Sequence, residues 1–167
     1  EVDLLQQPEV ARNDSRRCYF CKKYLMRRCI DRAAQLGFSI LADGSNRDDL
    51  GDYRPGSEAA NELGILSPLQ EAGFTKQDIR SLSRSLQLPT AGKPAFACLA
   101  SRIPYGTPLT LKALSQVEAC EAFLLERGFG NCRARYHGNS VRIEVAPELL
   151  HKLIEDPLRS MLIAHCK

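Results

Sequence analysis

The sequence lacks any long hydrophobic run, since its longest apolar stretches, such as residues 96–100, are far too short to cross a bilayer. It opens with no positively flanked apolar leader, and it contains no internal repeat or low-complexity tract. These absences argue against a membrane-spanning protein, and the sequence contains no recognisable signal that would direct it out of the cytosol. We therefore expect a cytoplasmic protein with no membrane partner.

A large net charge is also missing. The formal charge of +3 is too mild to argue for a nucleic-acid partner, although 23 basic side chains could gather around an anionic ligand. The balance of 44% hydrophobic and 26% charged residues is typical of a globular chain. A chain of 167 residues fits one ordinary domain, or a domain with a small appendage.

The first half of the chain has the pattern of an open α/β sheet. Apolar residues at helical spacing predict a helix over residues 19–36, with Gly37 as its stop, and residues 38–42 read as a short buried strand. A polar turn follows that strand directly. In such sheets ligands bind outside the carboxyl ends of the strands. We expect a Rossmann-like parallel sheet here.

From about residue 108 onward the sequence predicts a smaller α+β unit, and a further helix precedes it in the first region. A helix begins at Thr75, whose hydroxyl can cap the amide of Asp78. Four prolines and two glycines then prevent regular structure over residues 88–108. A helix over residues 110–127, a hairpin of residues 133–136 and 141–145, and two further helices complete the chain. The predicted regions are residues 1–90, a Pro-rich active-site loop of residues 91–108, and residues 109–167.

Two cysteines three positions apart, Cys18 and Cys21, stand at a helix start among basic residues. The helix dipole and these cations favour the thiolate form. The pair alone could be unligated, redox-active or metal-binding. Among the other cysteines, we expect Cys29 to be a buried core thiol. Packing roles are expected for Cys120 and Cys132, and Cys166 lies at the end of the chain.

Cys98 differs from these because it lies in the Pro-rich loop between basic residues, which makes it a functional candidate. With Cys18 and Cys21 it gives three thiolates. Structural zinc prefers four ligands, and the sequence has no second CxxC pair and only three histidines. Three thiolates on a four-iron, four-sulfur (4Fe-4S) cluster would leave one iron open for an exogenous ligand. Zinc with His137 as fourth ligand remains an alternative.

Arginines form a second group of candidates. Arg133 and Arg135 share one face of their strand, where two guanidiniums indicate a phosphate or carboxylate ligand. The alternative is a solvated strand face with Glu144 across the hairpin. Ser101 and Arg102 would add a hydroxyl and a third cation. The remaining candidate, Glu121, is a general base or a surface acid, and its spacing alone favours the surface.

The turn after the predicted strand, residues 43–49, offers a weaker site. Its glycine, Gly44, lets backbone amides approach a nucleotide, and its acids could hold Mg²⁺. Such Asp-rich turns are usually only turns.

Three motifs carry a resemblance: ADGSNRDDLGDYRPG, LQEAGFTKQDIRSLSRSLQLP and KPAFACLASRIPYGTPLT. In this order they resemble the LarE family of sulfur transferases, within the PP-loop ATP pyrophosphatases. The resemblance implies an adenine-nucleotide-hydrolase-like fold with a small C-terminal domain. It also implies adenylylation of the carboxylates of a pyridinium dicarboxylate mononucleotide, followed by their conversion to thiocarboxylates. The product is a precursor of the nickel-pincer cofactor.

The family has two sulfur sources. One branch sacrifices the sulfur of a single cysteine, which would fall at Ala97 here. This sequence is similar to the other branch, which holds a 4Fe-4S cluster on three cysteines and delivers cluster-bound sulfide repeatedly. Carried over by position, the substrate-pocket and catalytic candidates are Ser101, Arg102, Glu121, Arg133 and Arg135, with Cys98 both catalytic and a ligand. The residues expected to bind ATP and Mg²⁺ are Gly44, Asn46, Asp49 and Arg54.

The PP-loop motif Ser-Gly-Gly-x-Asp-Ser and the arginine-bearing C-terminal tail of the family do not occur in these residues, and the first residue is Glu1 rather than Met. We expect that both ends are cut. The resemblance suggests a homo-oligomer that works with other cofactor-biosynthesis proteins. Two rival functions remain open: a cluster-dependent tRNA thiolase, and a zinc-stabilised binding module without catalysis.

Overall fold

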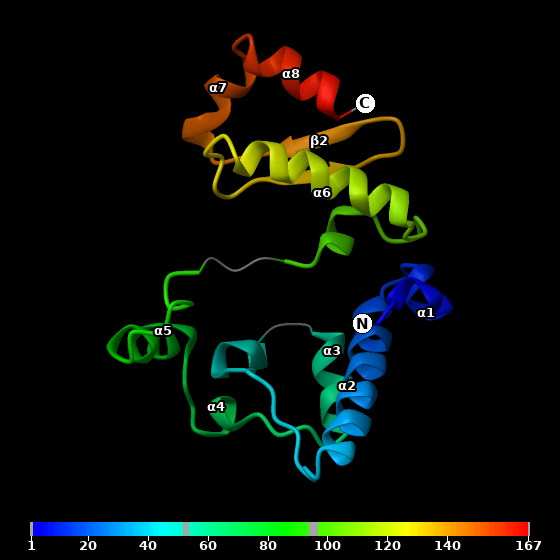
Figure 1. The fold of residues 1–167 in the computed structure, drawn as a ribbon, viewed down its shortest axis with the longest axis vertical. Helices are drawn as coiled ribbons and strands as arrows, with labels where there is room; N and C mark the ends of the chain where they lie inside the picture. The colour runs from blue at the N-terminus through cyan, green and yellow to red at the C-terminus, as the bar shows by residue number, and fades with distance from the viewer. Residues whose placement is uncertain (1, 52–53, 94–96, 167) are drawn as a thin grey trace. The chain divides into compact units, whose positions relative to one another are not determined.

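The computed structural model describes residues 2–51, 54–93 and 97–166 (Figure 1). The chain divides into two compact units. Residues 15–96 form one, here the N-terminal unit, and residues 1–14 together with 97–167 form the other, here the C-terminal unit. The first 14 residues thus belong with the second half of the chain, whereas we expected them to open the first region.

The N-terminal unit is helical. Its long helix α2 (Arg17–Gln35) packs along α3 (Pro55–Glu62), and the hydroxyl of Tyr19 donates a hydrogen bond of 2.7 Å to Glu62 between the two helices. The prediction of a helix over residues 19–36 is confirmed. The other elements are η2 (Arg47–Gly51), α4 (Pro68–Glu71) and α5 (Lys76–Ser85).

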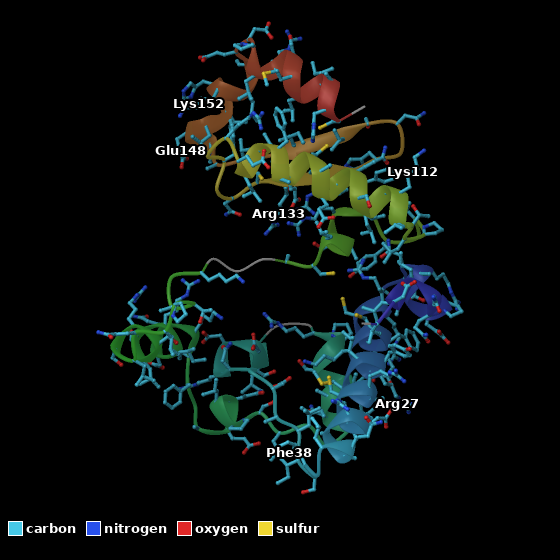
Figure 2. The ribbon with its side chains drawn as sticks, viewed as in Figure 1. Arg27, Phe38, Lys112, Arg133, Glu148 and Lys152 are labelled. Carbon is cyan, nitrogen blue, oxygen red and sulfur yellow. The ribbon has the colours of Figure 1, made fainter. Side chains whose placement is uncertain are left out.

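The predicted buried strand of residues 38–42 is wrong in its burial and its length. Among the described residues, the only pairing of this segment is an isolated parallel bridge between Ala42 and Leu66. Phe38 and Ile40 are 65% and 67% exposed, and Figure 2 shows Phe38 at the edge of its unit. A strand buries its side chains only where other elements cover its faces, and the exposure of Phe38 and Ile40 shows that the described residues do not cover this segment.

The prediction that Cys29 is a buried core thiol is also wrong, because its side chain is exposed. Helix α2 buries only the face that meets α3, at its first turns, and Arg17 and Tyr19 are its buried residues. The apolar stripe of the sequence is therefore wider than the face that this helix buries.

The C-terminal unit carries the sheet. Helix α6 (Leu111–Leu125) covers one face of the antiparallel hairpin formed by β1 (Arg133–Tyr136) and β2 (Val141–Glu144). The hairpin and the helix start at Thr110, which caps the amide of Ala113, are both as predicted. The other elements are η1 (Leu4–Gln6), α1 (Pro8–Ala11), η3 (Leu99–Arg102), η4 (Pro147–Leu149), α7 (Leu150–Ile154) and α8 (Leu158–His165).

Two apolar clusters form the core of this unit. One joins α6 to α8 through Phe123, Leu124 and Leu162, and the other joins α6 to β1 through Val117 and Ala134. The hairpin face that meets α6 is therefore its apolar face, and its other face is left for polar side chains.

A buried asparagine connects the first residues to the segment before α6. The side-chain amide of Asn13 donates to the carbonyls of Pro104 at 2.9 Å and Thr107 at 2.7 Å. The amide of Gly106 in turn donates to the Asn13 carbonyl at 2.9 Å. These bonds order the end of the Pro-rich loop, whose residues 94–96 lie outside the described residues.

The chain thus combines helices with a small antiparallel sheet, which agrees with the α/β character that we predicted. The extent of a parallel sheet stays a prediction. Of the helices in the described ranges, none combines the length and the apolar character that a bilayer crossing requires.

Candidate functional site

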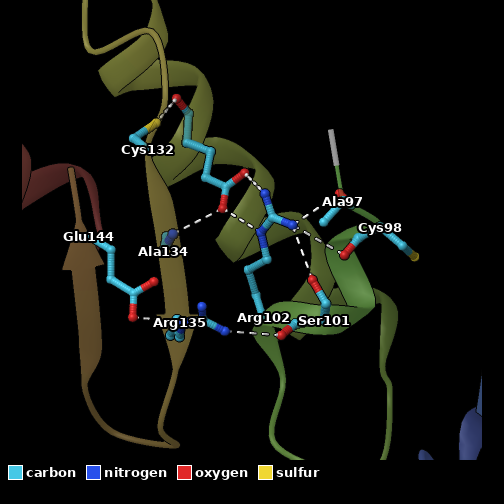
Figure 3. A network of polar contacts seen from close by, with 9 residues as sticks. Ala97, Cys98, Ser101, Arg102, Cys132, Ala134, Arg135 and Glu144 are labelled. Atoms are coloured by element: carbon cyan, nitrogen blue, oxygen red, sulfur yellow. Dashed lines mark hydrogen bonds and ion pairs between the residues drawn. The ribbon is translucent and has the colours of Figure 1, made fainter. Parts of the chain in front are cut away.

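Arg102 is the centre of a buried polar network in the C-terminal unit (Figure 3). It ends the short turn η3, and its side chain is only 3% exposed. Its Nε and Nη2 donate to the two carboxylate oxygens of Glu121 at 2.7 and 2.9 Å, in the bidentate geometry of a strong ion pair. Its Nη1 donates to the carbonyl of Ala97 at 2.9 Å, to that of Cys98 at 3.3 Å and to Ser101 Oγ at 3.1 Å.

Glu121 is buried, so the surface position that its spacing favoured is wrong. Its Oε1 also accepts a hydrogen bond of 2.9 Å from the backbone amide of Ala134 in β1. The sequence held a signal for this burial, because position 121 lies four residues after Val117 and three before Leu124, both buried. A charged residue on a buried face is paired, and its partner Arg102 comes from a distant part of the chain.

The outer face of the hairpin carries three arginines and one glutamate. The register pairs Arg133 with Glu144 and Arg135 with Arg142, and directly paired residues share a face. Arg135 Nε and Arg142 Nη2 lie 2.7 and 2.8 Å from the same Glu144 oxygen. The hydrogen bond from Arg135 is the largest cause that lowers the pKa of Glu144, and the same bond raises the pKa of Arg135. Two guanidiniums, those of Arg135 and Arg142, thus share one carboxylate oxygen, and our sequence reading missed Arg142.

This arginine face extends to the turn that carries Ser101. The Nη1 of Arg135 donates to the Ser101 carbonyl at 3.5 Å. A hollow of about 200 Å³ beside the face is lined by Arg133 and Glu144, with Asn131, Val145 and Ala146. Hydrogen bonds therefore link Arg135 to Ser101, Ser101 to Arg102 and Arg102 to Glu121, and Arg133 lies on the same strand face two residues from Arg135.

A larger cavity of about 560 Å³ lies between the first half of α6, the hairpin tip and the end of α8. Its lining includes Lys112, Tyr136 and Cys166 but none of the predicted site residues. We place the candidate site at the arginine face because charge and hydrogen-bond donors converge there, which a cavity volume alone does not indicate.

The predicted ligand cysteines are not joined in disulfides. Cys18 is exposed and Cys21 half-buried at the start of α2, and Arg17 Nη2 lies 3.7 Å from the Cys18 sulfur. Cys98 is exposed, and Figure 3 shows its sulfur on the side of the turn away from Arg102. Free thiols near a cation are suitable donors for iron or zinc.

The three thiols divide between the units: Cys18 and Cys21 belong to the N-terminal unit and Cys98 to the C-terminal unit. Within residues 2–51, 54–93 and 97–166, no three His, Cys, Asp or Glu side chains are grouped so that they could hold a metal ion. The three-cysteine site therefore stays a prediction.

The polar turn after Ala42 is braced by its own side chains. The amide of Asn46 donates to Asp49 at 3.0 Å, and Arg54 Nη1 lies 2.7 Å from the other Asp49 oxygen. Three of the predicted nucleotide residues therefore meet. A Cβ added at Gly44 would have no atom within 4 Å, so no protein contact requires glycine there.

Asp43 anchors the same turn. Its carboxylate accepts hydrogen bonds from Lys22 at 3.0 Å, from the Ser45 amide at 3.0 Å and from the Ser67 hydroxyl at 2.9 Å. Burial raises the pKa of Asp43, but these bonds together outweigh it and lower that pKa to about 2. Asp43 is therefore a carboxylate at every pH near neutrality.

Together the fold and the site define an α/β protein with an arginine face beside a cysteine-bearing turn. No family profile matches the chain. Curated relatives do. The chain is 40% identical over 144 residues to the pyridinium-3,5-bisthiocarboxylic acid mononucleotide synthase of Lactiplantibacillus plantarum, an alignment that covers 86% of this chain and 52% of the synthase.

Two uncharacterized proteins are similar as well. One from Synechocystis sp. is 41% identical over 156 residues, covering 93% of this chain and 58% of that protein. One from Methanocaldococcus jannaschii is 29% identical over 148 residues, covering 89% and 58%. The chain spans a little over half the length of these relatives. It belongs to the LarE family, as the motifs in its sequence indicate.

Proposed function

We propose that the protein is an ATP-dependent sulfur transferase that converts pyridinium-3,5-dicarboxylate mononucleotide to its thiocarboxylate in nickel-pincer cofactor biosynthesis. The observation that carries the proposal is the convergence of Ser101 and Arg135 beside the Cys98 turn, in a chain similar to a synthase of a pyridinium bisthiocarboxylic acid mononucleotide. A mononucleotide with two carboxylates is an anion, and the arginine face is suited to bind one.

In this proposal Arg133 and Arg135 bind the phosphate of the substrate. The face carries three guanidiniums and the single carboxylate of Glu144, so it keeps excess positive charge even with its internal ion pairs formed. The face is also open to solvent, since the side chain of Arg142 is 61% exposed and that of Glu144 is 35% exposed. The hydroxyl of Ser101 adds a neutral donor at the edge of the face.

ATP and Mg²⁺ would be held by Gly44, Asn46, Asp49 and Arg54, at the carboxyl end of the strand that a Rossmann-like parallel sheet would contain. The parallel bridge at Ala42 supports that placement. A free carboxylate is a poor acyl donor, and its adenylylation provides a leaving group that sulfur can displace. Asp49 and Arg54 already form an ion pair, which keeps a cation and an acid together at this turn.

Cys18, Cys21 and Cys98 would hold a 4Fe-4S cluster, and the exposure of Cys18 and Cys98 supports their role as ligands. When bound, the cluster would supply the sulfur atom. Ala97 has no thiol to sacrifice, which supports repeated turnover rather than consumption of the chain. We further propose a cytoplasmic homo-oligomer that hands its product to other cofactor-biosynthesis proteins.

The substrate is tested with the full-length protein. We expect ATP-dependent thiolation of the pyridinium dicarboxylate mononucleotide and none of tRNA, with AMP released in step with thiocarboxylate. Thiolation of tRNA instead would replace the proposal by its nucleic-acid rival.

The metal is tested by anaerobic reconstitution of the full-length protein with iron and sulfide. We expect a broad visible absorption that is lost in Cys98→Ala and kept in Cys29→Ala, a matched control because Cys29 is an equally exposed thiol on α2. Stoichiometric zinc without colour would support the zinc-stabilised module instead.

A further inference from the structure

The contacts of Arg102 leave it little capacity for a ligand. Each of its three side-chain nitrogens donates to a protein acceptor, and the side chain is 3% exposed. A guanidinium that binds substrate must offer at least one pair of donors to the solvent side. Arg102 instead directs its donors at Glu121 and at the turn that precedes it.

We propose that Arg102 and Glu121 are positioning residues that fix the Cys98 turn against the arginine strand, rather than a substrate ligand and a general base. The inference deepens the proposed function and rests on it for the identity of the reaction. Its structural part depends only on the contacts within the C-terminal unit.

Hydrogen bonds to its carbonyl groups hold the backbone of the Cys98 turn. Arg102 Nη1 donates to the carbonyls of Ala97 and Cys98, and the Ser101 amide donates to the Cys98 carbonyl at 2.9 Å. With these carbonyls fixed, the backbone at Cys98 is oriented while its sulfur stays exposed. A site whose reactive or ligating atom projects from a turn gains precision when the turn itself is fixed by buried polar contacts.

Both carboxylate oxygens of Glu121 are already engaged by protein donors. Its Oε1 accepts from Arg102 Nε and from the Ala134 amide, and its Oε2 accepts from Arg102 Nη2. A general base must come within hydrogen-bond reach of the proton that it takes, and this carboxylate faces the protein interior. Because Ala134 lies between Arg133 and Arg135, the same carboxylate sets the arginine strand and the Cys98 turn relative to each other.

The test uses Glu121→Gln and Arg102→Lys in the full-length protein, with Glu118→Gln as the matched control on an exposed position of the same helix. The first readout is hydrogen exchange without substrate. We expect the Ser101 and Ala134 amides to exchange at least about tenfold faster in both variants and unchanged in the control. Unchanged exchange of the Ser101 amide in both variants would overturn the proposal.

The second readout is the kinetics of sulfur transfer. We expect both variants to lower kcat/KM by a similar factor, the double variant to be no worse than either, and the pH profile to keep its shape. Loss of the acidic limb in Glu121→Gln alone would identify a base, and a rise in KM alone for Arg102→Lys would identify a substrate ligand; either result overturns the proposal.

If the variants do not fold, hydrogen exchange of the unmodified protein still tests the proposal. There the Ser101 and Ala134 amides should open together, at the same free energy, and more slowly than the exposed Asp78 amide of α5. Independent opening of the two amides would contradict the proposal that the Arg102–Glu121 pair fixes the Cys98 turn and β1 together. Hydrogen exchange needs no substrate. Failure of the sulfur-transfer assay alone would therefore count against the proposed function and not against the positioning role of Arg102 and Glu121.

Discussion

At the scale of single residues, Asp43 provides a pH-dependent contribution to stability. Its pKa is lowered to about 2 in the folded protein, from 3.8 for the free group. The stability from this group is therefore complete above pH 3.8 and is lost as the pH falls through 2. We expect Asp43→Asn to remove about 1–2 kcal/mol from the free energy of unfolding at pH 6 and little at pH 2.

Urea unfolding at the two pH values measures this difference. Asp31→Asn, at an exposed position of α2, is the control and should leave the pH dependence as it is. If Asp43→Asn destabilises equally at pH 6 and pH 2, the hydrogen bonds to its carboxylate do not hold the charged form.

Cys120 is a residue whose surroundings suppress its chemistry. Burial raises the pKa of its thiol to about 12, and contact with Cys166 and the charge of Glu121 act in the same direction. Since the thiolate is the reactive form, we expect Cys120 to be alkylated at pH 8 at least ~100-fold more slowly than the exposed Cys29. Mass spectrometry of iodoacetamide-treated protein measures both rates, and urea should make them equal. Equal rates in the folded protein would contradict the burial.

At the scale of elements, α5 begins with a capping box. Thr75 Oγ1 accepts from the Asp78 amide at 3.2 Å, and Asp78 accepts from the Thr75 amide at 2.9 Å. Thr75→Ala should lower the free energy of unfolding by about 1 kcal/mol, because the first turn loses one partner for its amides. Chemical denaturation measures the change. Ser81→Ala, on the exposed middle of the same helix, should stay within about 0.5 kcal/mol of the wild type, and an equal loss there would show that the cap contributes nothing.

The hairpin is the element that binds substrate in our proposal. Replacing Arg133 and Arg135 together by Gln should raise KM for the mononucleotide at least about tenfold, because two charge-assisted contacts to the phosphate are lost. KM for ATP should change little. Steady-state kinetics of the full-length protein measure both constants, with Arg159→Gln, which removes one exposed arginine of α8, as the control. An unchanged KM for the mononucleotide would remove the arginine face from the site.

Elements with local signals could be predicted from the sequence. The turn between the two strands predicted the hairpin of β1 and β2, the cap at Thr75 predicted the start of α5, and the start of α6 near Thr110 was predicted as well. The segment of residues 38–42 was not predicted well, because the burial of a strand depends on partners elsewhere in the chain. Glu121 illustrates the same limit for the site: its ion-pair partner, Arg102, lies 19 residues earlier and in a different element.

At the scale of the whole molecule, the candidate groups distribute over both compact units. The polar turn of residues 43–49 belongs to the N-terminal unit together with Cys18 and Cys21. The arginine face and Cys98 belong to the C-terminal unit. Residue type and spacing singled out the cysteines and the pair Arg133 and Arg135, but they missed Arg142 and placed Glu121 at the surface. The buried network behind the Cys98 turn could not be predicted, because it depends on tertiary contacts between η3, α6 and β1.

The central claim is repeated sulfur transfer without consumption of the chain, and the number of sulfur atoms transferred per chain tests it most directly. The measurement uses full-length protein reconstituted with iron and sulfide, supplied with ATP, excess sulfide and pyridinium dicarboxylate mononucleotide under anaerobic conditions. We predict several thiocarboxylates per chain, with all seven cysteines intact by mass spectrometry. At most one sulfur per chain, with loss of sulfur from Cys98, would contradict the account.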